Sequence, residues 1–134
     1  MLSKRWLILL LPFLLLLMAA RQLPLIDPEP IPVPAGMSAE DTAREIKRSF
    51  IGRGWEISDE KPGSLNATLH LRSHVATVGV RYDDSAVHIA YRASENLKYQ
   101  MKRSGPSIHK NYLSWVDNVV TDMKRNLQLA ALDE

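Results

Sequence analysis

The chain has 134 residues, with 17 Lys and Arg against 15 Asp and Glu and no Cys. This length is enough for one domain with a single hydrophobic core. The absence of Cys excludes disulfides and a lipid attached to an N-terminal cysteine, and the nearly balanced charge argues against general nucleic-acid binding, which needs a net basic surface.

The first twenty residues have the layout of an export signal. Lys4 and Arg5 precede an apolar run over residues 6–20 that contains no charged residue and ends in small side chains, and this order is typical of a secretory signal. A spanning helix needs about 20 apolar residues, whereas this run is shorter and is interrupted by Pro12. We interpret residues 1–20 as a signal peptide, with a retained N-terminal membrane anchor as the alternative. The remaining chain is expected in the periplasm, either soluble or anchored in the inner membrane through its apolar run.

Residues 21–37 are predicted to form a Pro-rich linker. Proline fixes φ and pushes the preceding residue toward extended conformations, so a stiff, polyproline-like spacer is expected. The interpretation as a stalk that lifts a domain off a membrane stands beside that of an ordinary N-terminal tail. The five prolines of the segment are Pro24, Pro28, Pro30, Pro32 and Pro34.

The first helix is predicted over about residues 39–52. Ser38 is suited to cap the first turn, and the acidic residues that follow it favour the positive end of a helix. Gly52 or Gly54 is expected to end the helix. One apolar stripe at helical spacing is formed by Ala43, Ile46 and Phe50.

Four runs of alternating apolar and polar residues follow, which predicts an antiparallel β-meander with one covered face. A two-residue turn at Ser73-His74 would place Leu69 opposite Val78. A four-residue turn over 83–86 would place Val80 opposite Ile89. The four runs begin at Trp55, Ala67, Ala76 and Val87.

A polar connector is predicted over 93–107, and an amphipathic helix of about 20 residues after it. The order α-β-β-β-β-α predicts an α+β fold, in which two helices pack on one face of a four-stranded antiparallel meander. This single domain is expected to span residues 38–130. The apolar stripe of the last helix consists of Ile108, Tyr112, Trp115, Val119, Met123 and Leu127.

The uncovered face of the predicted sheet is locally basic. Lys4 and Arg5 carry the chain's surplus of positive charge, yet residues 61–110 hold eight Lys and Arg against three acidic residues. Such a face suits an anionic ligand, a lipid headgroup or an acidic protein surface. The alternative is an ordinary solvated face. The candidate binding residues are His70, Arg72, Arg81, His88 and Arg92.

No motif for catalysis, metal binding or cofactor binding is found. His70 and His74 are four residues apart in a predicted strand, hence about 13 Å apart, too far to share an ion. No zinc, nucleotide or nucleophile signature accompanies the histidines. We therefore expect a protein that is not an enzyme and has no metal or cofactor. Its partner is expected to be an unknown envelope protein or an anionic surface, and not a nucleic acid.

Over residues 34–128 the chain resembles a family of small exported proteins of unknown function from Gram-negative bacteria, many of them predicted lipoproteins. The resemblance implies a location in the cell envelope and transfers no catalytic residue. This chain departs from the lipoprotein pattern because it has no Cys. The resemblance rests on Pro34-Ala35-Gly36, Gly52-Arg53-Gly54-Trp55, Leu71-Arg72-Ser73-His74 and Ile108-His109-Lys110-Asn111-Tyr112.

Overall fold

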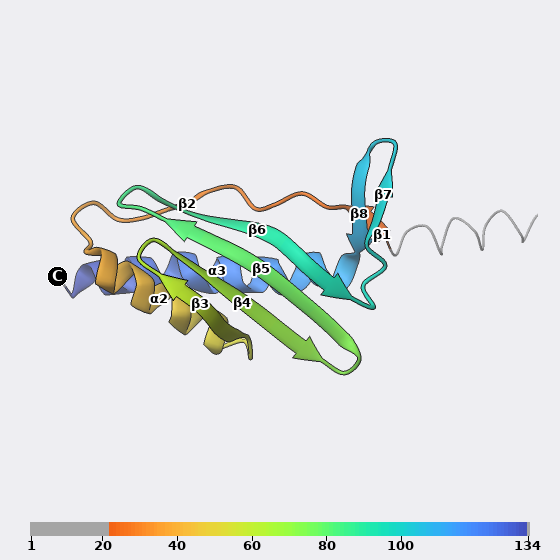
Figure 1. Ribbon diagram of the computed structural model, residues 1–134. Coiled ribbons are helices and arrows are strands. Elements are labelled where there is room, and N and C mark those ends of the chain that lie inside the picture. The colour runs from red at the N-terminus through yellow and green to blue at the C-terminus, as the bar shows by residue number, and fades with distance from the viewer. Residues whose placement is uncertain (1–21, 134) are drawn as a thin grey trace, which may run out of the picture.

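The structure is a computed structural model that describes residues 22–133, so the predicted export segment, residues 1–20, lies outside the described residues. Two helices pack with antiparallel sheets, which confirms the predicted α+β class (Figure 1). The helices are α2 (Ala39–Ile51) and α3 (Lys110–Leu132). The strands are β1 (Gln22–Pro24), β2 (Ile31–Pro32), β3 (Glu56–Lys61), β4 (Ser64–Leu71), β5 (His74–Tyr82), β6 (Ala86–Glu95), β7 (Gln100–Lys102) and β8 (Gly105–His109).

Helix α2 begins and ends as its sequence predicts. The Ser38 hydroxyl accepts a hydrogen bond from the Asp41 backbone N–H at 3.0 Å, which satisfies one of the free donors of the first turn. Gly52 caps the C-terminus, and Gly54 turns the chain with a φ of 87°. This turn brings Trp55 back onto Phe50, with their ring centroids 5.4 Å apart in an edge-to-face pair.

Helix α3 starts two residues later than the apolar stripe suggests. Ile108 belongs to β8, and His109 caps the helix by accepting the Asn111 backbone N–H on Nδ1 at 3.0 Å. The remainder of the predicted stripe lies on the buried side of α3, apart from the half-buried Trp115. Among residues 22–133, no helix is both long enough and apolar enough to cross a membrane.

The meander β3-β4-β5-β6 is present, and β2 adds a fifth strand next to β6. The predicted pairing of Val80 with Ile89 is confirmed. The predicted pairing of Leu69 with Val78 is wrong, because Leu69 lies opposite Ala76. The two-residue turn consists of Arg72 and Ser73, so the pairing shifts by two residues. A shift of two leaves every side chain on the face of the sheet that the alternation predicts.

One hydrophobic core fills the space between the five-stranded sheet and the two helices. The inward residues of β4, β5 and β6 are buried, and both helices add large apolar side chains to the same cluster. This arrangement leaves the opposite face of the sheet, here called the open face, for polar side chains. The largest fully buried side chains include Phe50, Ile46, Leu65, Met123 and Leu127.

The described part of the predicted linker lies against the domain and is not a free stalk. Its extended conformation agrees with its prolines, but β1 pairs with β8 and β2 pairs with β6. Ile31, Val33 and Met37 are buried in the core. Proline is tolerated here because both segments form edge strands, where a missing N–H donor removes no ladder hydrogen bond.

The predicted connector over 93–107 is largely strand. The first three of its residues continue β6, and β7 and β8 form a hairpin that pairs with β1 in a separate three-stranded sheet. Gly105 takes a φ of 119°, which allows the tight reversal between the two strands. The pairing partner of this hairpin comes from the N-terminal segment, so the polar sequence alone gave no sign of it.

Candidate functional site

Three of the five candidate residues surround a hollow on the open face. Arg81 lies directly opposite His88 across β5 and β6, and Gly79 lies opposite Ala90 in the same pair of strands. Because Gly79 has no side chain and Ala90 only a methyl group, the sheet surface is hollowed between larger neighbours. This sheet hollow has a volume of about 290 Å³ and is lined by Gly79, Arg81, His88, Ala90, Tyr91 and Arg92.

Arg92 is aimed at the hollow by an irregularity in the sheet. Thr77 pairs with Ala93 and Val78 pairs with Tyr91, so the residue between them has no partner on β5. An extra residue of this kind bends the strand and redirects its side chain. The guanidinium of Arg92 lies over Gly79, where any β-carbon would collide with its Nε.

The two arginines at the hollow have no acidic partner among residues 22–133. Arg81 and Arg92 are exposed, and neither takes part in an ion pair or a side-chain hydrogen bond with the described residues. Asp83, in the turn between β5 and β6, is hydrogen-bonded within that turn. Two guanidinium groups and an imidazole around one concavity form a donor set that matches an oxyanion.

The Asp83 carboxylate is held by hydrogen bonds within the β5–β6 turn. Its Oδ1 accepts the backbone N–H of Ser85 at 2.8 Å, the Ser85 hydroxyl at 2.8 Å and the backbone N–H of Ala86 at 2.9 Å. These bonds, the one from the Ser85 backbone first, lower the pKa of Asp83 to about 2, and the charge of His88 adds a smaller lowering effect.

The other two candidate residues lie away from the hollow. His70 is exposed on β4 and pairs with Val75 near the hairpin end. Arg72 is not on a strand but in the β4–β5 turn, with a φ of 57°. The prediction of one continuous binding face therefore needs correction, because the turn register displaces Arg72 from it.

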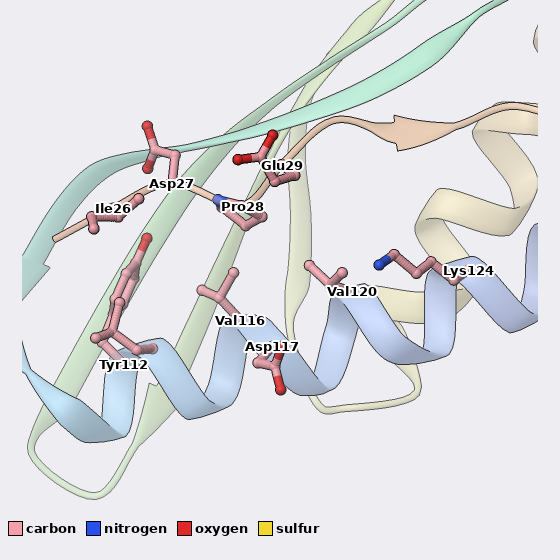
Figure 2. Close-up of a pocket in the computed structure, with 10 residues that line it drawn as sticks. Ile26, Asp27, Pro28, Glu29, Tyr112, Val116, Asp117, Val120 and Lys124 are labelled. Carbon is pink, nitrogen blue, oxygen red and sulfur yellow. The ribbon is translucent and has the colours of Figure 1, made fainter.

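A larger groove lies between the N-terminal segment and α3, and sequence reasoning missed it. The groove has a volume of about 420 Å³. Figure 2 shows Asp27 and Glu29 above the groove, and Tyr112, Val116 and Val120 along the helix beneath it. The two sides come from segments more than 80 residues apart in the sequence, and one of these segments was predicted as a linker.

The N-terminal groove is apolar at its floor and acidic at its rim. Leu113, Val116 and Val120 supply apolar surface, whereas Asp27, Glu29 and Asp117 outnumber the single cation Lys124. The Asp27 carboxylate also accepts the Tyr91 backbone N–H at 3.0 Å, which fixes the segment on β6. Burial first, then Asp27 and Tyr91, raise the pKa of Tyr112, so its hydroxyl stays protonated.

The histidines are dispersed in the fold. His74 Nδ1 lies 2.7 Å from the carbonyl oxygen of Asn96, His109 caps α3, and His88 lies at the sheet hollow. Within residues 22–133, no three His, Cys, Asp or Glu side chains gather in a way that would hold a metal ion.

Comparison of the chain with protein-family models, with curated proteins and with solved structures gave no match. The resemblance to small exported Gram-negative proteins therefore stays a prediction, and the functional argument rests on the geometry of this chain.

Proposed function

We propose that the protein is an exported, non-enzymatic binding module of the Gram-negative cell envelope that holds an oxyanion in the sheet hollow. The observation that carries this proposal is the convergence of Arg81, His88 and Arg92 on one concavity, where neither arginine forms an ion pair with any of residues 22–133. Phosphate and carboxylate groups share the geometry that a guanidinium recognises through two parallel hydrogen bonds.

The lining of the hollow favours binding over catalysis. Arginine donates hydrogen bonds but does not release a proton at physiological pH, so it positions an anion and does not act as a base. The one hydroxyl among the lining residues belongs to Tyr91, and it lies 2.8 Å from the hydroxyl of Ser94. Tyr91 also lies opposite the buried Val78 and packs on Tyr112 of α3, so its ring is on the helix side of the sheet and not on the open face.

The test is a titration of the full chain, in neutral detergent, with inorganic phosphate. We expect saturable amide shifts at Gly79 and Ala90, weakened by salt because the contact is ionic. Arg92→Gln should lower the affinity at least tenfold, the scale of one charged hydrogen bond. Arg72→Gln is the matched control, since Arg72 is an exposed arginine of the β4–β5 turn that lies outside the hollow.

Two outcomes count against the proposal: the absence of saturable binding, and equal losses in Arg92→Gln and Arg72→Gln. Equal losses would mean that phosphate affinity depends on the net charge of the protein alone. A parallel titration with glycerol 3-phosphate and with phosphatidylglycerol vesicles identifies the source of the oxyanion. Shifts at Gly79 with vesicles but not with the soluble ester would assign the hollow to a lipid headgroup.

The N-terminal groove supports a second candidate function, the docking of a cationic, apolar peptide segment. Its apolar floor and its three carboxylates complement alternating Leu and Lys side chains. A synthetic peptide of alternating Leu and Lys is expected to bind the full chain and to lose affinity in Glu29→Gln/Asp117→Asn. Glu56→Gln/Asp84→Asn, which removes the same two charges at exposed positions outside the groove, should leave binding intact; equal losses would reject the groove as the site.

A further inference from the structure

The hairpin of β7 and β8 projects from the end of the molecule where the described chain begins. Figure 1 shows β7, β8 and β1 standing apart from the five-stranded sheet, beside the start of β1. Gln22 pairs with His109, so the three-stranded sheet begins directly after the apolar run of residues 6–20. The small sheet is therefore close to this apolar run in the sequence.

Three exposed apolar side chains lie on this small sheet or directly beside it. Of the eight large hydrophobic residues that are exposed in residues 22–133, Leu23 belongs to β1, Met101 belongs to β7 and Tyr99 directly precedes β7. Met101 is 67% exposed. Exposed apolar groups that gather in one place, and are not scattered singly, indicate an interaction surface.

The same hairpin is positively charged. From Asn96 to Asn111 the sequence contains four basic residues and no acidic one. None of the four forms an ion pair with any residue in the range 22–133. The combination of exposed apolar side chains with unpaired cations is typical of protein surfaces that lie at an anionic bilayer interface. The basic residues are Lys98, Lys102, Arg103 and Lys110.

The base of the hairpin is fixed, so these side chains are presented in one arrangement. Leu97 is buried in the core, and its carbonyl accepts the His109 N–H at 2.8 Å. The Asn96 side-chain amide donates to the Ser73 carbonyl at 2.8 Å. Tyr99 stacks on Tyr91 with ring centroids 4.8 Å apart. A surface that is already ordered loses little conformational entropy on binding.

We propose that the β7–β8 hairpin docks on the surface of an anionic phospholipid bilayer. Met101 enters the interfacial layer, while Lys98, Lys102 and Arg103 contact lipid phosphates. This contact would hold the domain in a fixed orientation at the membrane, with the hairpin end toward the lipid. It does not depend on the sheet hollow, which is formed by other residues of the domain.

The absence of Cys allows a clean labelling test on the full chain. Met101→Cys is labelled with an environment-sensitive nitrobenzoxadiazole fluorophore, and Leu129→Cys is the matched control. Leu129 is also exposed but lies near the C-terminal end of α3, which is at the opposite end of the molecule from the hairpin (Figure 1). Both proteins are reconstituted with phosphatidylethanolamine–phosphatidylglycerol vesicles that contain a nitroxide-labelled lipid.

We expect blue-shifted emission at position 101 and a several-fold stronger quenching there than at position 129. Lys98→Gln/Lys102→Gln/Arg103→Gln in the Met101→Cys background should remove that difference. Equal quenching at the two positions of the unmodified hairpin would overturn the proposal, as would selective quenching that survives loss of the three charges. This assay contains no added phosphate and the phosphate titration contains no bilayer, so failure here is distinguishable from failure of phosphate binding.

Discussion

Arg92 reaches the sheet hollow through two properties of its neighbours. The irregular pairing between Thr77 and Val78 leaves Arg92 without a partner on β5. The missing side chain at Gly79 then gives the guanidinium a place to lie across the neighbouring strand. The candidate site therefore depends on a glycine that contributes no functional group, and a substitution there separates packing from binding.

Gly79→Ala is expected to weaken phosphate binding about tenfold, the scale of one charged hydrogen bond, because the added methyl group displaces the Arg92 guanidinium. Stability should change by less than about 1 kcal/mol, since the atom displaced is the end of a flexible side chain and Ala is no worse than Gly in a strand. Phosphate titration and thermal unfolding measure the two effects.

Gly63→Ala is the matched control for this substitution. Gly63 turns the chain between β3 and β4 with a φ of 84°, so Ala there is strained and should lower stability while phosphate affinity is kept. If Gly79→Ala behaved like Gly63→Ala, with lost stability and unchanged affinity, the position of Arg92 would have no part in binding.

The lowered pKa of Asp83 predicts how stability depends on pH in the acid range. Its pKa is lowered from 3.8 to about 2 in the folded protein, so the folded state favours the carboxylate. The stabilisation is fully present above the ordinary pKa and is lost as pH falls through about 2. Asp83→Ala should therefore lower the urea midpoint at pH 7, and the difference from the unmodified protein should shrink toward pH 2.

Asp84→Ala provides the comparison, because Asp84 is the adjacent exposed carboxylate in the same turn. It should leave the urea midpoint nearly unchanged at either pH. Equal effects of the two substitutions at pH 7 would show that the hydrogen bonds of Asp83 do not stabilise the turn.

At the scale of elements, the N-terminal segment has the proline content of a free linker, yet it packs against the domain. Its prolines correctly predict extended backbone, but the same spacing places Ile31 and Val33 where they are buried beside β6. A free spacer has no reason to bury such residues. The segment is therefore structural in its described part, and its apolar residues should matter for stability.

Ile31→Ala is expected to destabilise the protein by about 2–5 kcal/mol, the range for a large aliphatic residue removed from a core. Ile26→Ala, in the same segment but 75% exposed, should change stability by no more than about 0.5 kcal/mol. Urea unfolding of the full chain measures both. A negligible effect of Ile31→Ala would mean that the segment does not pack on the domain.

The elements that were predicted well are those with strong local periodicity. Helix α2 and the strands of the meander follow from stripes and alternation that depend only on near neighbours in sequence. The turn at Arg72 was misplaced because a non-glycine residue with a φ of 57° has no local signal. The hairpin of β7 and β8 was missed because its partner β1 lies about 80 residues away.

The candidate site was predicted in part for the same reason. Alternation places Arg81, His88 and Arg92 on the open face, and the structure brings these three together. Sequence gave no means to see that Gly79 and Ala90 form the hollow, or that Arg92 lies in an irregular pair. The N-terminal groove could not be predicted, because one of its sides belongs to residues that were assigned to a linker.

At the scale of the whole molecule, charge is separated although the totals balance. Residues 22–60 carry eight Asp and Glu against four Lys and Arg, whereas residues 61–110 carry the reverse excess. The acidic rim of the N-terminal groove and the basic surfaces of the sheet and hairpin follow from this division. Such an asymmetric field orients a protein near an anionic surface.

The two basic surfaces should act as separate sites and not as one diffuse field. Arg81→Gln/Arg92→Gln is expected to abolish phosphate shifts at Gly79 while selective lipid quenching at position 101 is retained. The triple Gln variant of Lys98, Lys102 and Arg103 should show the opposite pattern. Exposed charges are strongly screened at about 0.15 M salt, and the two variants change different side chains, so their effects should be separable there. If either variant lost both readouts, the charge separation of the molecule, and not two local sites, would govern its contacts.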